Sequence, residues 1–381
     1  MKIGVIFGGR SCEHDISIIT GIMTLNAASE RHSVIPIYID GSGDWWTGKH
    51  LNTTQVFADG TYKKKAVKIH LRPNSCHIYS DKGKKIYKLD AVIICTHGRN
   101  GEDGSLAGLL ELSGVAYVGS NILASAVGMD KIMQKRIFKQ AGLNVVRHTD
   151  VEKGEIRTNL YDLVNKVDTL KFPLILKPST LGSSIGIVRV WDYQELFEGL
   201  NSALLWDDRV LIEEALCDFV ELNCAVLGAS GVGGELLVSE VEEPISDGFL
   251  GYSEKYELFG GGSKGEVLEA SKGCLGRYLP ARIDGDLREE VYETAKRVFR
   301  LLGCSGVARV DFMLKDGVLY VNEINTVPGS MSNYLFEFGG LSFSAMVEKL
   351  IKIAIEEFDK KGRLKLRFDS NVLKGGGGGK G

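Results

Sequence analysis

Two apolar runs near the end of the chain carry polar side chains at alternate positions. Arg309 and Asp311 lie in the run V-A-R-V-D-F-M-L, and Glu323 and Asn325 lie in the run V-L-Y-V-N-E-I-N. The letters K-D-G between the runs predict a tight turn, and therefore a hairpin of two strands. Side chains alternate faces along a strand, so three oxygen-bearing groups and one guanidinium can gather in one patch.

This patch has the chemistry of a magnesium site. Hard oxygen ligands with open coordination positions suit Mg²⁺ bridged to a polyphosphate. Asp311, Glu323 and Asn325 would supply those oxygens. A solvated hairpin with charges on its wet face is the alternative interpretation. The strongly apolar flanks favour the metal, because burying an unpaired charge is expensive.

Two glycine-rich turns predict further sites at strand ends. Residues 2–7 form an apolar run that ends in Gly8-Gly9, and a helix is expected from there through about Ser29. The turn T-H-G-R-N-G-E-D-G follows a strand expected over 86–95 and contains His97. Strand, turn and helix make an α/β unit, whose functional loops lie at the carboxyl ends of its strands. A lone histidine is usually structural, but this one stands at a strand end beside glycines, which favours a ligand site.

A third candidate is the segment K-P-S-T-L-G-S-S-I-G, which begins at Lys177. A lysine at a strand end, followed by hydroxyls and glycines, suits a loop that covers phosphates with backbone N–H groups. The order of residues is not that of a P-loop, and a plain surface turn stays open as an alternative. The glycines at 260–265 fit a dinucleotide fingerprint by letter only, because no strand precedes them and no clear helix follows.

The pattern of the whole chain predicts an α/β protein of three domains that position these loops. Further strands are expected near 33–39, 145–151, 173–177, 185–190, 211–216 and 220–228, and helices near 105–112, 121–128, 130–142, 286–302 and 342–359. We predict an N-terminal α/β domain over 1–119, a small central domain over 120–210 and a C-terminal domain over 211–368. A long loop at 243–281 predicts a lid within the last domain, and a glycine-rich tail at 369–381 is expected to be mobile.

Composition excludes several classes of protein. The chain has 381 residues, which is enough for two or three domains, and a formal net charge of −3. This balance disfavours wholesale binding to nucleic acid or to an anionic membrane. No apolar run approaches the roughly 18 residues of a membrane span, and no signal peptide is recognised. The 7 cysteines show no metal-type spacing and are expected to be reduced, so a cytoplasmic protein is predicted.

Taken in order, these segments resemble the ATP-grasp family, and within it the D-alanine–D-alanine ligases. The resemblance rests on these segments, in the family's order: G-G-R-S-C-E-H-D-I-S, H-G-R-N-G-E-D-G-S-L, M-D-K, K-P-S-T-L-G-S-S-I-G, L-I-E-E, E-K-Y, A-R-V-D-F and N-E-I-N-T-V-P-G. Any one of them is weak, but the ordered set is specific. The fold that it implies is an N-terminal parallel α/β domain followed by two ATP-grasp domains that sandwich the nucleotide.

The resemblance also implies roles for individual residues. Roles in binding ATP fall on Lys131, Lys177, Ser184, Glu213, Leu216, Glu221 and Lys255. Ligation of a pair of Mg²⁺ ions, which Mn²⁺ can replace, falls on Asp311, Glu323 and Asn325. Catalytic roles fall on Glu13, which holds the first substrate's amino group, on its partners Ser183 and Tyr256, and on the oxyanion donors Arg309 and Gly329. Substrate contacts fall on Ser17, His97, Tyr334 and Leu335.

The implied reaction joins two D-alanines at the expense of ATP, through an acyl phosphate, for peptidoglycan synthesis by a homodimer. Tyr334 stands where the family has a small hydroxyl residue that binds the second carboxylate, and Leu181 and Ala107 also depart from the family pattern. The alternatives are therefore a different second amino acid, a D-hydroxy acid or another dipeptide, and a nucleotide-binding module without ligase activity. We predict that the phenol of Tyr334 donates to the second substrate's carboxylate.

Overall fold

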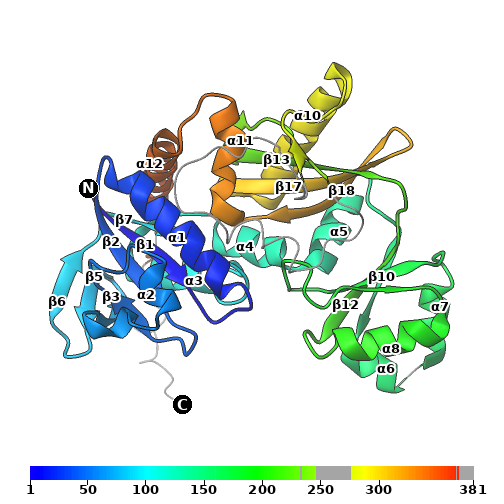
Figure 1. Ribbon diagram of the computed structural model, residues 1–381, viewed down its shortest axis with the longest axis horizontal. Coiled ribbons are helices and arrows are strands. Elements are labelled where there is room, and N and C mark those ends of the chain that lie inside the picture. The colour runs from blue at the N-terminus through cyan, green and yellow to red at the C-terminus, as the bar shows by residue number, and fades with distance from the viewer. Residues whose placement is uncertain (159, 232–233, 246–275, 366, 369–381) are drawn as a thin grey trace, which may run out of the picture.

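The described residues form three β-sheets of four or more strands, with helices packed on them, and one two-stranded ribbon (Figure 1). This computed structural model describes residues 1–158, 160–231, 234–245, 276–365 and 367–368. The mixed α/β architecture agrees with the class predicted from the sequence. In the view of Figure 1 the first sheet lies at the left, the last sheet at the top and the middle sheet at the lower right.

The first sheet has eight strands in the order β6-β5-β4-β3-β2-β1-β7-β8. Its parallel part consists of β1 (Lys2–Gly8), β2 (Ser33–Ile39), β7 (Ala91–Ile94) and β8 (Ala116–Val118). Its antiparallel part consists of β3 (Trp45–Thr47), β4 (Val67–Arg72), β5 (Ser75–Ser80) and β6 (Lys85–Lys88). The short helices α2 (Gln55–Ala58) and η1 (Tyr62–Lys64) lie between β3 and β4 in the chain.

The strand predicted over 86–95 is in fact two strands at different places in the sheet. β6 lies at the outer edge, whereas β7 pairs with β1 in the parallel part. The chain changes direction at Leu89 and Asp90, where the Asp90 carboxylate accepts a hydrogen bond of 2.7 Å from the backbone N–H of Lys2. Because apolar residues lie on both sides of this corner, the sequence pattern did not reveal it.

Helices cover both faces of the first sheet. On one face, α1 (His14–Ser29) and α12 (Phe343–Gly362) enclose a cluster of buried side chains from β1 and β7. On the other face, α3 (Ser105–Ser113) packs on a second cluster. The backbone leaves β1 through Gly8, which has a φ of +85°, and an added Cβ there would stand only 2.2 Å from the Ile39 carbonyl oxygen, so no other residue fits. This sharp exit brings the start of α1 next to the loop that follows β7.

The middle sheet is smaller and has its own core. Its strands run in the order β11-β10-β12-β9, all antiparallel, with bounds β9 (His148–Glu152), β10 (Leu174–Pro178), β11 (Val188–Val190) and β12 (Arg209–Glu214). The helices of this unit are α6 (Lys153–Thr158), α7 (Leu160–Val167) and α8 (Tyr193–Ala203). The predicted domain boundary at 210/211 falls inside β12, so we move it to the segment after Glu214.

The last sheet carries the predicted hairpin. Its order is β14-β13-β17-β18, with bounds β13 (Val220–Ala229), β14 (Leu236–Val238), β17 (Ser305–Lys315) and β18 (Val318–Asn325). Between β14 and β17 in the chain lies a two-stranded ribbon, which consists of β15 (Glu243–Pro244) and β16 (Arg277–Tyr278). After β18 come η2 (Gly329–Ser332) and α11 (Asn333–Phe338).

Two hydrophobic clusters sandwich this last sheet. One face packs against α10 (Gly285–Leu302) together with α4 (Ile122–Met129) and α5 (Lys131–Gln140). The sequence grouped α4 and α5 with the central domain, but Ala124 and Phe138 are buried against the last sheet. The opposite face contributes Ala225 and Val307 to the cluster that also fills the first sheet. The first and last sheets therefore share one continuous core.

Candidate active site

The predicted hairpin forms and brings its polar residues together. β17 pairs with β18 in a register that sets Arg309 opposite Asn325 and Asp311 opposite Glu323. The Arg309 guanidinium donates from Nε to Asp311 Oδ1 at 2.6 Å and from a terminal nitrogen to Oδ2 at 2.8 Å. The Asn325 amide donates to Oδ2 of the same carboxylate at 3.0 Å. Burial opposes the charge of Arg309, but the Asp311 carboxylate raises the pKa of Arg309 well above its ordinary value.

The donor set of this patch fits a magnesium ion. Carboxylate and amide oxygens converge from two paired strands, and Glu323 already has a cation beside it, the Lys131 ammonium at 3.3 Å. The described residues contain no group of three His, Cys, Asp or Glu side chains suited to a metal, because one of the three predicted ligands is an asparagine. Asp311, Glu323 and Asn325 are therefore the residues that would hold the ion.

A buried cluster of two lysines and one carboxylate stands between the middle and last sheets. Lys177 on β10 contacts Glu213 Oε2 on β12 at 2.5 Å, and Lys135 on α5 contacts Oε1 at 2.8 Å. Burial opposes ionisation of Glu213, but these two cations outweigh it and lower the pKa of Glu213 to about 2. The cluster thus carries an excess positive charge in a place of low solvent access, which suits an anionic phosphate chain.

Lys135 was missed by the sequence analysis. It is 1% exposed, and burial lowers its pKa. The available signal was its place one turn after Lys131 on a predicted helix, because residues at i and i+4 share a helix face. Lys131 itself begins α5, which Asp130 caps by accepting from the Met133 N–H at 3.1 Å. The same carboxylate accepts from the Ser179 hydroxyl at 2.7 Å, so the helix start and the predicted phosphate loop are fixed together.

The phosphate loop reaches the first sheet. Ser183 and Ser184 both adopt left-handed backbone angles, with φ of 55° and 59°. The Ser183 hydroxyl donates to the Glu13 carboxylate at the start of α1, a pairing that the family resemblance implied. Gly182 lies so close that an added Cβ would stand 2.9 Å from the Glu13 oxygens. A side chain there would displace either the loop or the Glu13 carboxylate.

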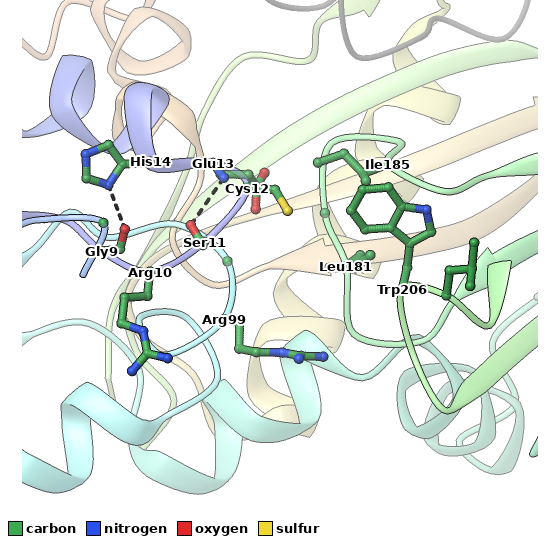
Figure 2. A pocket seen from close by; sticks show the side chains of 14 residues that line it. Gly9, Arg10, Ser11, Cys12, Glu13, His14, Arg99, Leu181, Ile185 and Trp206 are labelled. Atoms are coloured by element: carbon green, nitrogen blue, oxygen red, sulfur yellow. Dashed lines mark hydrogen bonds between the residues drawn. The ribbon is translucent and has the colours of Figure 1, made fainter. Parts of the chain in front are cut away.

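A cleft of about 450 Å³ opens in front of Glu13, between the first sheet and the phosphate loop (Figure 2). One wall carries Arg10, Ser11 and Arg99, and the other carries Leu181 and Trp206. Glu13 has only 8% of its surface exposed, at the inner end of the cleft. The arrangement can hold a small molecule with a cationic group against Glu13.

His97 and Glu102 connect the first and last sheets. The two ring nitrogens of His97 lie 2.9 Å from the Val327 carbonyl and 2.9 Å from the Thr20 hydroxyl. Glu102 accepts from the backbone N–H groups of Gly98 at 3.0 Å and Val327 at 3.3 Å. Both side chains thus position the segment that follows β18. Glu102 was quoted within a motif but given no role by the sequence analysis.

Glu102 leads to a pH-dependent prediction. Burial, and then the charge of Glu13, raise the pKa of Glu102 to about 8. A carboxyl group with a raised pKa holds its proton more tightly when the protein is folded, so stability present below the ordinary pKa is lost as the pH rises toward about 8. We expect Glu102→Gln, which is neutral throughout, to remove this loss. The midpoint of urea unfolding, measured for both proteins across this pH range, tests the prediction. A midpoint that falls equally with rising pH in the variant and in the wild type would contradict it.

The predicted substrate residues occupy different environments. Ser17 is fully buried, accepts from the Gly8 N–H and donates to the Cys95 carbonyl, so its hydroxyl ties the ends of β1 and β7. Leu335 is fully buried in the shared core. The Tyr334 hydroxyl donates to Glu242 at 2.7 Å. Substrate contact by any of the three stays a prediction.

Some of the remaining predicted residues lie in the described part of the chain, and others do not. Leu216 follows β12, Glu221 lies on β13 and Gly329 begins η2. Lys255, Tyr256 and most of the predicted lid lie outside the described residues, as does the glycine-rich tail. Within the described ranges, no helix is long and apolar enough to cross a membrane.

Comparison with known families decides the identity of the fold. Residues 2–120 match the family described as D-ala D-ala ligase N-terminus, and residues 137–352 match the one described as D-ala D-ala ligase C-terminus. The chain belongs to the D-alanine–D-alanine ligase family. This is a family of ATP-dependent ligases with the ATP-grasp fold, so the resemblance drawn from the sequence motifs is confirmed.

Individual members of the family match almost end to end. The D-alanine–D-alanine ligase of Thermosipho melanesiensis is 37% identical over 384 residues, which cover 98% of each chain. The solved structure of the Coxiella burnetii D-alanine-D-alanine ligase superposes with a TM-score of 0.78 at 26% identity, over 95% of this chain and 96% of that one. The VanG D-Ala:D-Ser ligase of Enterococcus faecalis gives 0.77 at 32% identity, over 93% and 99%.

Proposed function

We propose that this ligase condenses two D-alanines to D-alanyl-D-alanine, with ATP converted to ADP and phosphate. The observation that carries the proposal is the convergence of three elements: the Glu13–Ser183 contact, the Lys135–Glu213–Lys177 cluster and the Arg309–Asp311–Asn325 patch. They supply an ammonium site, a polyphosphate site and a metal site in one region. The near full-length match to D-alanine–D-alanine ligases supports the choice of substrates.

Glu13 binds the ammonium group of the first D-alanine, and the cleft in front of it admits the rest of the molecule. Lys131 and Lys177 bind the phosphates of ATP and neutralise the charge that develops as the γ-phosphoryl group moves to the substrate's carboxylate. This step replaces a poor leaving group with phosphate. Asp311, Glu323 and Asn325 would hold the Mg²⁺, which would supply further charge neutralisation.

The second D-alanine then attacks the acyl carbon with its amino group. The resulting oxyanion requires donors that are already in position, and we assign them to Arg309 and the Gly329 N–H. In this structure both donor edges of the Arg309 fork face Asp311. To donate to the oxyanion, Arg309 would have to give up one of its two contacts with Asp311.

A different second amino acid is the second candidate. Tyr334 brings a bulky phenol to a position where the family has a small hydroxyl residue, and a 32% identical relative of known structure is a D-Ala:D-Ser ligase. We further propose that the protein works in the cytoplasm as a homodimer on small-molecule substrates, without nucleic acid or membrane partners, in peptidoglycan synthesis.

A panel of amino acids distinguishes these candidates. The protein is incubated with ATP, Mg²⁺ and pairs drawn from D-alanine, D-serine, D-lactate and L-alanine, and the condensed products are identified by mass. We expect D-alanyl-D-alanine as the main product and phosphate release that depends on the amino acids. A dominant mixed product would favour the second candidate, and absence of any condensed product would contradict the proposal. Mn²⁺ in place of Mg²⁺ is expected to support turnover.

A further inference from the structure

Tyr334 belongs to a compact polar cluster beside the proposed metal site. Its hydroxyl donates to Glu242 Oε2 at 2.7 Å, and the Asn223 amide donates to the same oxygen at 3.2 Å. The other oxygen of Glu242 contacts Arg277 at 3.0 Å. The Arg277 guanidinium carbon lies 4.6 Å from the centre of the Tyr334 ring. Four side chains, from β13, from the residue before β15, from β16 and from α11, thus meet at one point.

Strand register places this cluster next to the reacting groups. Asn223 stands directly opposite Asp311 in the pairing of β13 with β17. Tyr334 follows Gly329 by one turn of η2 and lies at the start of α11. Glu242 and Tyr334 are near enough to Arg309 to contribute to the raised pKa of Arg309, after burial, which lowers it, and Asp311, which raises it most. The cluster therefore lies beside the Arg309–Asp311 pair.

Most of the hydrogen-bond donors near this point already have an acceptor within the protein. A phenol has one proton, and that of Tyr334 goes to Glu242, so toward the site Tyr334 offers only lone pairs. Arg309 directs both donor edges to Asp311. Arg277 makes one ion pair with Glu242, and 42% of its side chain is exposed. A guanidinium has five N–H donors, so Arg277 retains donors for an incoming anion.

We propose that Arg277 binds the carboxylate of the second amino acid, held in place by Glu242 and by the face of Tyr334. This inference rests on the proposed function, because it assumes that a second amino acid condenses at this site. Here the guanidinium replaces the small hydroxyl that is absent at position 334. Glu242 is a positioning residue: it fixes the guanidinium by an ion pair and turns the phenol proton away from the substrate. A charged, planar donor pair suits a carboxylate better than a single hydroxyl does.

A purely structural ion pair is the alternative, and the chain contains a matched example of one. Arg282 contacts Glu243 and stacks 3.6 Å from the centre of the Tyr278 ring. Glu243 and Tyr278 pair directly across the β15–β16 ribbon and are the chain neighbours of Glu242 and Arg277. Arg282 is therefore a second arginine that pairs with a glutamate and stacks on a tyrosine, and it has no contact with Tyr334 among those described. It serves as the control.

The test compares the second amino acid with its amide, which lacks the negative charge. For D-alanine as second substrate, Arg277→Met is expected to raise KM about ten- to a hundredfold, the range for a hydrogen bond to a charged group. For D-alaninamide, the same variant is expected to leave KM within about twofold of the wild-type value. The KM values for ATP and for the first D-alanine should stay unchanged. Arg277→Lys should recover part of the loss, and Arg282→Met should resemble the wild type.

Each outcome assigns or removes the role. A rise in KM for both acid and amide would show that Arg277 only shapes the site, and no rise for either would show that it is not the anchor. If Arg282→Met raises KM as much as Arg277→Met does, the cause is a general disturbance of the ribbon and not the loss of a contact with the substrate's carboxylate. If the wild type condenses another second amino acid, that acid and its amide replace the D-alanine pair. Condensation by the wild type without any carboxylate preference would overturn this inference alone, whereas no condensation would overturn the proposed function as well.

Discussion

Glu323→Gln and Asp311→Asn are each expected to lower kcat about a hundred- to a thousandfold. Each substitution removes one negative charge and keeps the shape of the side chain. The charge matters when Mg²⁺ neutralises the phosphoryl group in transfer, so both variants should lose turnover. Glu323→Gln should affect folding little, whereas Asp311→Asn also removes the carboxylate that pairs with Arg309 and should lower thermal stability as well. Steady-state phosphate release at saturating D-alanine measures it, with thermal unfolding as the check on folding.

Asp316→Asn is the matched control for these variants. Asp316 lies in the turn of the same hairpin with a φ of 51°, is exposed, and is 5 residues beyond Asp311. Asparagine tolerates this left-handed conformation, so the turn is preserved. The control should retain wild-type turnover. If Asp311→Asn and Glu323→Gln also retain turnover within a few-fold, the hairpin is not the metal site.

Lys177→Met is expected to raise KM for ATP and to lower kcat, together reducing kcat/KM about a thousandfold. Lys177 carries half of the positive charge around Glu213, in a place where charges interact strongly because water is largely excluded. Glu213 keeps its contact with Lys135 in this variant, so no carboxylate is left buried and unpaired. Fluorescence titration with an ATP analogue would separate the binding loss from the loss of turnover.

Lys171→Met is the control for Lys177. Lys171 lies shortly before β10, on the same stretch of chain, and is exposed. Its replacement removes the same charge and adds the same thioether away from the cluster. Nucleotide affinity reduced to the same degree in both variants would mean that general charge, and not the buried cluster, attracts ATP.

The hairpin and the phosphate loop were predictable from the sequence because their signals are local. The alternation of Arg309 with Asp311, and the turn after Lys315, define a hairpin without any other part of the chain. The Glu13–Ser183 pair came from the family resemblance, since 170 positions separate the two residues. Local pattern carries no information on partners at such a distance.

The parts that escaped prediction depend on long-range packing. Lys135 is a catalytic-site neighbour only because α5 lies against β18 and Glu213 arrives from the middle sheet. The corner at Leu89 exists because β6 pairs with β5, whereas β7 pairs with β1 and β8 in another part of the sheet. The cluster of Glu242, Arg277 and Tyr334 joins three segments that have no common motif.

The middle sheet keeps its own core, whereas the first and last sheets share theirs. Denaturant can therefore release the middle unit, residues 148–214, without opening the core that the other two sheets have in common. The Lys177–Glu213–Lys135 cluster lies across that junction, with two members on the middle sheet and one on α5. A nucleotide bound there would stabilise the middle unit by an amount that depends on the nucleotide concentration, so the supply of this substrate would also affect how long the intact enzyme survives.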